Sequence, residues 1–498
     1  MKANCNKKNN VLRRKAVCRL LSLALFIPLL AAGCVMVGPD YEKPRPKTPE
    51  DWEAQMEKGL EASQPKNDRL SRWWTVFNDP VLTELEKRAV EGSLDVKTAF
   101  SRLRQARIRR GVSGADLYPG LSGSGRVQRQ EASESMPSAY GGEEMDYYLG
   151  QFDSSWELDL FGGIRRSVQA AQAELEASRA DINDVYTSLM AEVALNYIEV
   201  RTYQHRLAIT RENIGIQEKT YELNSSRYKA GLVDELAVQQ SLRNLERTRS
   251  QVSSLENGLI AAKNRLAVLL GLPPGVLNGE LTPPESIPKI PARVAVGIPA
   301  EAMRRRPDIR SAERRLAAQS ARIGAATAEL YPKFHLLGSI GLEALDNSSD
   351  FFDAKSRFWN IGPGVSWNIF QGRALRLNID LQTEKQKEAM IAYKSAVLHA
   401  REEIEDALTA YAKEQMREES LEKAVTAAQR TEALARDRYK AGLIDFYNVL
   451  DAQRSLLELE DELTRSQGQV ASSLARLYKA LGGGWQYYGE AVGGDASK

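Results

Sequence analysis

Cysteine and histidine are scarce in this sequence of 498 residues, which contains three of each. Two of the cysteines, Cys5 and Cys18, lie in a leader whose removal would leave a single thiol, Cys34, in the mature chain. No disulfide can form within such a chain, so packing must stabilise it. The histidines are scattered and match no metal-spaced cluster or nucleophile motif. We therefore expect a protein that is not an enzyme and that holds no metal or dissociable cofactor.

Long apolar segments are also missing after the leader, so a membrane crossing by this chain would not use transmembrane helices. The leader has a basic stretch and an apolar run at 20–32, which is shorter than the roughly 20 residues of a spanning helix. It ends in LAAGC, which resembles a bacterial lipobox with Ala31 in place of the usual Leu. We expect removal of residues 1–33 and attachment of diacylglycerol and an N-palmitoyl chain to Cys34. Val35 follows Cys34 at the position where inner-membrane lipoproteins commonly have Asp, so we expect delivery to the outer membrane. The alternative is that the leader is an ordinary signal peptide without lipid attachment.

A strong excess of charge of either sign is absent. The formal net charge is +2, but the leader has seven basic residues and no acidic one, so the mature chain has 61 basic and 66 acidic residues, a net charge of −5. This balance gives no electrostatic footprint for a nucleic acid. We expect no nucleic-acid partner.

A tandem repeat organises the rest of the chain. The hexapeptide RYKAGL occurs at 227–232 and again at 438–443, which is an offset of 211 residues. ADLYP and AELYP recur at an offset of 213, and a stretch rich in Pro and Gly separates the copies. The predicted segments are a lipid-anchored extended segment at 34–79, a first repeat at 80–272, a linker or equatorial segment at 273–300, a second repeat at 301–482 and a tail at 483–498.

Each repeat is predicted to contain a helix, a β-hairpin, a very long helix, a tight turn and another helix. The β-hairpins are expected at 117–161 and 332–371, and the helical hairpins at 163–271 and 372–481. The opening helix of the first repeat is expected to be continuous over 80–111. Coiled-coil packing is indicated by apolar residues spaced by seven, namely Val200, Leu207, Ile214 and Tyr221. The predicted fold class is mainly α, internally duplicated, with long helical hairpins and two β-hairpins per chain.

RYKAGL is typical of a helix end. Its basic residues favour the helix dipole, and Gly231 and Gly442 supply the left-handed residue that ends each long helix. We expect Leu232 and Leu443 to pack back against the last turn. Three residues after each glycine, Asp234 and Asp445 are suited to cap the next helix. A capped hairpin tip without further function is the alternative.

The strand segments alternate between apolar and polar residues. Tyr148, Phe152 and Trp156 share one parity, whereas Gln151 and Asp153 have the other. This alternation fits a half-buried soluble sheet or a lipid-facing barrel wall, and the strand lengths and nearby tryptophans favour the barrel. Four strands cannot close a barrel, because small barrels need about eight, and open edges are excluded from lipid. We therefore expect a homotrimer with a shared twelve-stranded β-barrel.

Four segments together resemble the TolC-like outer-membrane efflux factors, in particular the lipoprotein (NodT-type) branch that serves resistance-nodulation-division pumps. They are CVMVGPDYEKP, WWTVFNDPVLTEL, RRRPDIRSAERRLAAQSARIGAATAELYPKF and RYKAGLIDFYNVLDAQRSL. The resemblance covers the mature chain nearly end to end. It implies a trimer with a twelve-stranded barrel in outer-membrane lipid and a twelve-helix periplasmic tunnel. It also implies a periplasmic adaptor (membrane fusion protein) and an inner-membrane pump as partners.

The same resemblance implies a channel constriction in the second repeat. Carried over from Gly442, an apolar ring falls on Tyr447 and an acidic ring on Asp451, four residues apart and so on one helix face. Three such carboxylates around an axis would repel one another and raise one another's pKa. Gln240 occupies the position of Asp451 in the first repeat, so only the second repeat would supply the acidic ring.

Polar contacts that hold the tips closed are also implied. The resemblance assigns them to tip residues of both repeats: Arg438, Tyr439, Arg227, Tyr228 and Asp234. An acidic partner present in some family members would fall on Ala237 here, so Asp234 or Glu235 would have to replace it. The function implied is a passive outer-membrane exit channel of a tripartite efflux system. A duct for type I-like protein export and a non-transporting coiled-coil envelope lipoprotein are the alternatives.

Overall fold

The computed structural model describes residues 36–44, 51–63, 67–131, 133, 135, 142–282 and 286–488, so Cys34 lies outside the described residues. The chain divides into two compact units. Unit 1 comprises Met1–Pro44, Arg104–Ala177 and Ala312–Tyr393, and unit 2 comprises Arg45–Leu103, Ser178–Ser311 and Lys394–Lys498. Each unit therefore combines segments from both sequence repeats.

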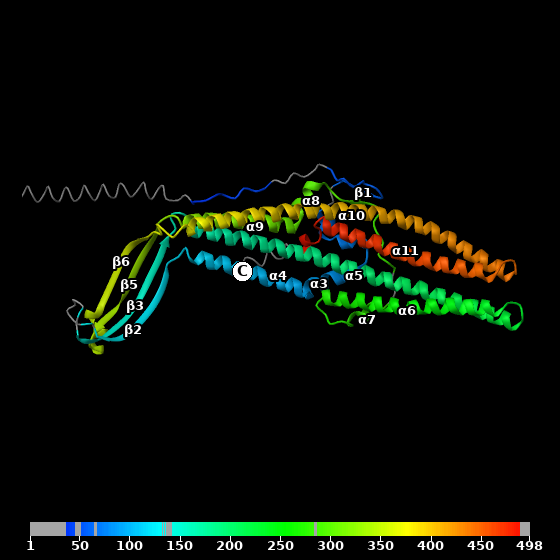
Figure 1. Ribbon diagram of the computed structural model, residues 1–498, viewed down its shortest axis with the longest axis horizontal. Helices are drawn as coiled ribbons and strands as arrows, with labels where there is room; N and C mark the ends of the chain where they lie inside the picture. Colours follow the sequence, from blue (N-terminus) through cyan, green and yellow to red (C-terminus); the bar gives the residue numbers. More distant parts are fainter. Residues whose placement is uncertain are drawn as a thin grey trace, which may run out of the picture. The chain divides into compact units, whose positions relative to one another are not determined.

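The duplication is visible in the helices (Figure 1). Helices α5 (Gly163–Lys229) and α10 (Ala374–Lys440) each have 67 residues, and α6 (Glu235–Leu269) and α11 (Phe446–Ala480) each have 35. All four pairs of bounds differ by the 211 residues that separate the two hexapeptides. The predicted fold class, with two long helical hairpins, is confirmed.

The opening helix of the first repeat differs from the prediction. It is broken at Ser93, whose ψ is 131°, into α3 (Pro80–Gly92) and α4 (Leu94–Ala115). The break lies where the backbone of Gly92 passes so close to Leu270 that a Cβ would be 2.1 Å from its carbonyl oxygen. The second repeat breaks at the corresponding place between α8 (Pro299–Arg305) and α9 (Pro307–Ala328), because Pro307 disfavours helical geometry in the residue before it.

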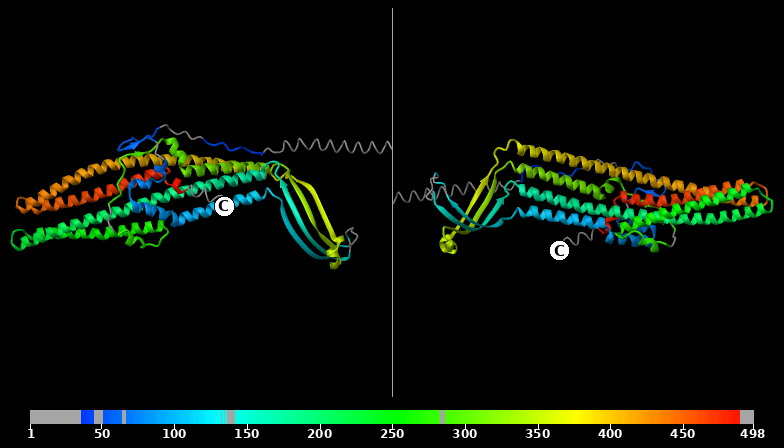
Figure 2. Two further views of the ribbon diagram at one scale, coloured as in Figure 1. Left: turned by 180° about the vertical axis from the view of Figure 1, so that it is seen from behind. Right: turned by 60° about the horizontal axis from the view of Figure 1, so that its bottom comes forward.

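Unit 1 contains one antiparallel sheet of four strands (Figure 2). The strands are β2 (Gly120–Glu131), β3 (Glu144–Leu158), β5 (Lys333–Leu345) and β6 (Arg357–Ser366), in that order across the sheet. The two β-hairpins of the repeats thus pair through β3 and β5. Strands β2 and β6 form the edges, and within the described chain each has one hydrogen-bonded neighbour.

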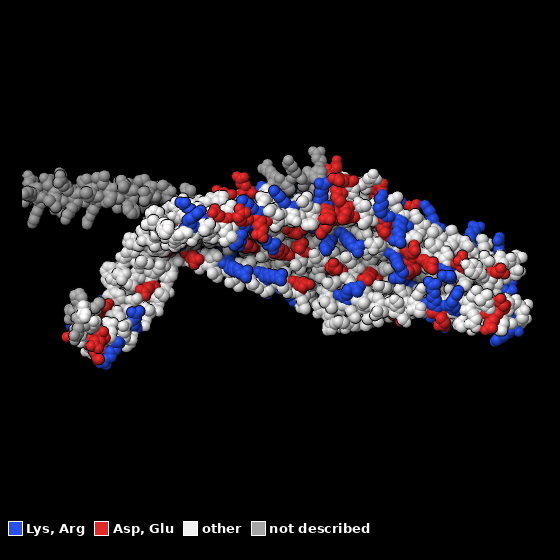
Figure 3. Space-filling model, in the orientation of Figure 1, with Lys and Arg blue, Asp and Glu red and all other residues white. Residues whose placement is uncertain are grey.

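The two faces of this sheet differ in polarity. One face carries large apolar side chains exposed by 60–77%: Leu121, Val127, Phe152, Ile340, Trp359, Ile361 and Val365. The other face carries Gln151, Asp153 and Glu157, and Gln151 donates to Asp153 at 2.8 Å. Figure 3 shows few charged side chains on the visible side of the sheet away from its loops. The alternation predicted from the sequence is therefore present, with the apolar face uncovered in a single chain.

Unit 2 has an aromatic core. Trp73 is fully buried and stacks on Tyr478, with ring centroids 5.6 Å apart. The remaining short elements are α2 (Asn67–Ser71), η1 (Trp73–Phe77), α7 (Leu277–Glu280) and the parallel pair β1 (Leu60–Glu61) and β4 (Val294–Ala295); unit 1 adds η2 (Ser348–Phe352) and η3 (Ala354–Ser356). Among the described residues, no helix combines the length and apolarity that a membrane crossing requires.

Candidate functional site

The two helical hairpins of unit 2 end in turns of the same geometry. Gly231 and Gly442 have φ values of 72° and 74°, and the amide after each glycine donates back five residues, at 2.9 Å, to close the helix end. These bonds define a Schellman cap, in which glycine takes the left-handed conformation without a Cβ penalty. The next residues, Leu232 and Leu443, are 68% and 73% exposed. The expectation that they pack back against the helices is therefore wrong.

The N-terminal caps of the two return helices are not equivalent. The Asp234 carboxylate accepts a hydrogen bond from the Ala237 amide at 3.1 Å and caps α6. Asp445 stands at the matching position before α11, but its side chain makes no capping bond. The prediction of a side-chain cap thus applies to the first tip alone.

Tyr439 lies in the core of the second tip. Its ring is buried in a cluster with Phe446, Val449 and Leu450 of α11 and with Ala237 of the other hairpin. Its hydroxyl donates to Asn224 Oδ1 of α5 at 2.8 Å. The Arg227 guanidinium lies 4.9 Å from the centre of the same ring and donates to the Tyr439 carbonyl oxygen at 3.4 Å. Tyr439 therefore joins the two hairpins at their tips.

The other proposed tip contacts lie outside this cluster. Tyr228, the counterpart of Tyr439 in the first repeat, is 45% exposed, and Arg438 is also exposed. Glu235 accepts from Gln239 of its own helix, at 3.4 Å, and does not contact Tyr439. Within one chain, the structure brings Tyr439 and Arg227 together and leaves Arg438 and Tyr228 facing outward.

Tyr447 and Asp451, the proposed constriction residues, are both exposed on α11. They stand one helical turn apart, and they alternate with the buried Val449 and Leu450 that face the tip core. In the described part of the chain, neither side chain has a hydrogen bond or ion pair. Both side chains are therefore accessible on the surface of a single chain.

A line of polar contacts continues from the tip between the two hairpins, and we call it the polar seam. It joins α5 to α11: Thr220 accepts from Gln453 at 3.2 Å, Asn213 donates to Glu460 at 3.1 Å, and Arg206 donates to Asp461 at 2.6 Å. Polar contacts exchange partners more readily than interlocked apolar side chains, so the seam suits two hairpins that shift against each other.

Asn224 was missed by the sequence analysis, although a signal was present. Three polar residues of α5 are also spaced by seven, and each lies three residues after an apolar position of the predicted heptads: Thr210, Gln217 and Asn224. All three are buried. Polar residues at such inward-facing heptad positions commonly specify register, and they predict a polar interhelical contact.

A second buried polar cluster centres on Arg306, at the break between α8 and α9. Its guanidinium donates to the Ala480 carbonyl oxygen at 2.9 Å and pairs with Asp308 and Glu403, each at 2.7 Å. Asp184 of α5 lies nearby and has no ion pair with any residue that the structure describes. Burial, followed by the Asp308 carboxylate, raises the pKa of Asp184 to about 6. Among the described residues, no group of three or more His, Cys, Asp or Glu side chains could hold a metal ion.

Comparison with known proteins places this geometry in a family. Residues 85–272 and 298–483 match the family model described as outer membrane efflux protein. Nodulation protein T of Rhizobium leguminosarum bv. trifolii is 33% identical over 462 residues, which cover 92% of this chain and 96% of that relative. Outer membrane protein OprJ of Pseudomonas aeruginosa is 30% identical over 463 residues, or 93% and 95% of the two chains.

The fold agrees with a solved channel. The structure of the outer-membrane channel OprN has a TM-score of 0.85 and 34% sequence identity, and the match covers 90% of this chain and 99% of that one. The resemblance inferred from the sequence is confirmed, and with it an outer-membrane location and the role of an exit channel for efflux. The chain belongs to the outer membrane efflux protein family.

Proposed function

We propose that three copies of this chain form a lipid-anchored duct that receives substrates from a periplasmic adaptor and a resistance-nodulation-division pump and releases them across the outer membrane. The four-stranded sheet of each copy supplies one third of a twelve-stranded barrel. The hairpins of the three copies form the periplasmic tunnel, with Tyr447 and Asp451 at its constriction.

The sheet carries this proposal. Its apolar face is exposed on four adjacent strands, and its edges β2 and β6 lack a second partner within the described chain. A bilayer leaves no water to satisfy an open strand edge, so such a sheet must close. Pairing β2 of one copy with β6 of the next satisfies both edges, directs the apolar face to lipid and directs Asp153 and Glu157 to the lumen.

The tips supply a surface for the adaptor. Leu232 and Leu443 project from equivalent turns and are 68% and 73% exposed. Isolated apolar side chains are common on protein surfaces, but a leucine at the same place on both tips forms a repeated apolar rim. This rim is the surface on which we expect the adaptor to dock.

Acylation at Cys34 remains a proposal from the LAAGC segment, because this residue lies outside the described part of the chain. Radioactive palmitate should label the wild-type protein and leave a Cys34→Ser variant unlabelled. Label retained in that variant would place the lipid elsewhere.

Two measurements test the duct. The protein purified in mild detergent should migrate as a trimer on blue-native gels and on unheated SDS gels, and as a monomer after heating. The same material should form conducting channels in planar bilayers. A stable monomer without channel activity would contradict the proposal and would favour a coiled-coil envelope lipoprotein.

The adaptor surface has its own test. Leu232→Asn combined with Leu443→Asn should weaken binding of the cognate adaptor to the purified trimer, while heat-modifiable migration stays unchanged. Unaltered adaptor binding would remove the rim from the docking surface and leave the duct intact.

A further inference from the structure

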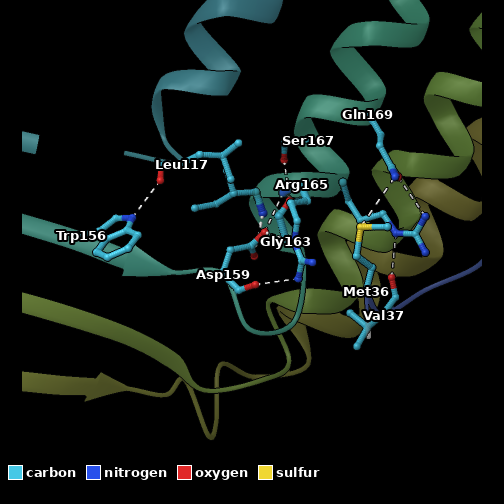
Figure 4. A network of polar contacts seen from close by, with 11 residues as sticks. Met36, Val37, Leu117, Trp156, Asp159, Gly163, Arg165, Ser167 and Gln169 are labelled. Atoms are coloured by element: carbon cyan, nitrogen blue, oxygen red, sulfur yellow. Dashed lines mark hydrogen bonds and ion pairs between the residues drawn. The ribbon is translucent and has the colours of Figure 1, made fainter. Parts of the chain in front are cut away.

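Residues 36–44, which we call the strap, are bound to unit 1 by hydrogen bonds and ion pairs at both ends. The Val37 amide donates to the Phe161 carbonyl oxygen at 3.1 Å. Arg166 of α5 is 4% exposed and donates to the carbonyl oxygens of Val37 and Gly38, at 3.2 and 3.3 Å. The same guanidinium pairs with Asp40 at 2.9 Å. Figure 4 shows Met36 and Val37 beside Gln169 at the start of α5.

Gly38 lets the strap approach the helices closely. Its φ is 86°, and a Cβ there would lie 2.4 Å from the Cα of Gly324 in α9. A larger residue would therefore be strained by its backbone conformation and would also collide with another backbone. At this point the strap cannot dock unless residue 38 is glycine.

The far end of the strap is fixed by a buried carboxylate. Glu313 of α9 accepts a hydrogen bond from the Tyr41 hydroxyl at 3.0 Å and pairs with Lys43 at 3.1 Å. The Arg314 guanidinium lies 5.4 Å from the centre of the Tyr41 ring, which packs against alanines of α5 and α9. Both ends of the strap are thus tied to the same pair of helices.

The N-terminal end of the strap, at Val37, lies at the end of the sheet where β3 leads into α5; we call this end the base of the sheet. Phe161, which binds Val37, follows β3 by three residues, and its ring stacks at 4.6 Å on that of Tyr331, two residues before β5. Cys34 precedes Met36 by two residues, and two residues span at most about 7 Å. Any acyl group on Cys34 is therefore attached within about 7 Å of Met36 along the chain.

We propose that the strap is a positioning lock. Arg166, Gly38, Gly324 and Glu313 hold the acylated end of the chain at the base of the sheet. The lipid anchor thereby keeps each sheet close to the membrane during trimer assembly. This inference rests on the acylation and the trimer of the proposed function. Without the lock, the anchor would be joined to the body by at least ten free residues instead of two. Effective concentration falls roughly as the −3/2 power of tether length, so a fivefold longer tether lowers it by about tenfold.

The test uses Gly38→Val in the full-length chain, which changes one residue of the strap and leaves the sequence of the helices unaltered. Trimer formation is followed in cells by pulse-chase and unheated SDS gels, and release of the strap by chymotrypsin cleavage after Tyr41, whose ring packs against the helices when the strap is bound. The variant should still incorporate palmitate, should become sensitive to chymotrypsin at Tyr41 and should form trimers about tenfold more slowly. Glu42→Ala is the matched control, because Glu42 is exposed and without a contact in the described residues.

A second background separates positioning from simple stabilisation. Gly38→Val is repeated in a chain that carries Cys34→Ser and is exported behind an ordinary cleavable signal peptide. A positioning lock predicts that Gly38→Val has no further effect on trimer formation there, since no anchor remains to be positioned. An equal delay in both backgrounds would overturn the inference, as would normal assembly of an acylated chain whose strap is released.

Failure of the proposed function would look different. Absence of palmitate on wild-type Cys34 would remove the anchor and the lock together while leaving channel activity measurable. A wild-type protein that is acylated but forms no channel would instead overturn the duct, and the assembly comparison would still decide the role of the strap.

Discussion

The Tyr439 hydroxyl donates to Asn224 Oδ1 at 2.8 Å, and both side chains are buried between the hairpin tips. The equivalent pair with the two repeats exchanged does not exist, because the counterpart of Tyr439 is the exposed Tyr228 and the counterpart of Asn224 is Ala435. The two copies share their turn geometry but differ in which tyrosine faces the interior. The contact that joins the tips is therefore built from one residue of each repeat.

Removing this hydroxyl should favour the open channel. Tyr439→Phe leaves the buried Oδ1 of Asn224 without its donor, at a cost of about 1–3 kcal/mol to the closed tip. We expect a higher single-channel conductance or open probability in planar bilayers, and a larger effect for Tyr439→Ala. Tyr228→Phe is the control, because that hydroxyl is not buried. Equal conductance of Tyr439→Phe, Tyr439→Ala and wild type would exclude this residue from the gate.

Asp184 should make the folded protein less stable as the pH rises. Its pKa in the folded chain is about 6, above the usual 3.8, so the native state holds the proton more tightly than the unfolded chain does. The resulting stability is present at low pH and is lost as the pH rises from about 4 to above 6. The groups that face Asp184 are Asp308, Arg306, Asp181 and Lys479.

Asp184→Asn is therefore expected to raise the thermal midpoint at pH 7 and to flatten its dependence on pH. We expect a gain of about 1–2 kcal/mol at neutral pH, after allowance for partial solvent screening. Glu458→Gln, at an exposed position of α11, should leave the pH profile unchanged. A pH profile of Asp184→Asn parallel to that of wild type would show that this carboxyl does not cause the dependence.

Glu86 should be replaceable by an apolar residue with a gain in stability. It is fully buried on α3, neither carboxylate oxygen has a hydrogen-bond partner among the described residues, and burial raises its pKa well above 4.5. An unpartnered buried carboxyl destabilises the fold at neutral pH, because the unfolded chain ionises freely. Glu86→Met should raise the thermal midpoint at pH 7 more than at pH 4. A lower midpoint at pH 7 would reveal a structural role for the acid.

The contact between α5 and α11 should not tolerate a methyl group at Gly468. A Cβ there would lie 2.2 Å from Thr202 Oγ1 and 3.1 Å from its Cγ2. Gly468→Ala should lower stability by about 1–3 kcal/mol, which thermal unfolding of the purified protein would measure. Gly215→Ala, in α5 with nothing within 4 Å of its Cβ, should raise stability by about 0.5–1 kcal/mol. Stabilisation by both changes would mean that the helices separate more easily than the packing indicates.

Much of the fold could be predicted because it is encoded in local patterns. The repeated hexapeptide gave the offset of all four hairpin helices, and the alternation around Phe152 and Asp153 gave the two faces of the sheet. The break at Ser93 could not be predicted, because it depends on the passage of Gly92 against Leu270. Long-range packing of this kind leaves no periodic signal.

At the hairpin tips, too, the local features could be predicted and the long-range contacts could not. The left-handed glycines follow from the sequence, since helix ends are local. The exposure of Leu232 and Leu443 and the partnership of Tyr439 with Asn224 depend on how two hairpins meet, and residues 215 positions apart give no such indication on their own.

The 211-residue offset is kept to the residue through both helical hairpins, whereas β2 and β5 begin 213 residues apart and β3 and β6 end 208 apart. One extra residue in α5 would turn everything after it by about 100° and lift the polar seam out of alignment. Insertions and deletions have accordingly accumulated in and around the β-hairpins. Foreign peptide tags should therefore be accepted in the loop between β2 and β3 and rejected anywhere along α5 or α10.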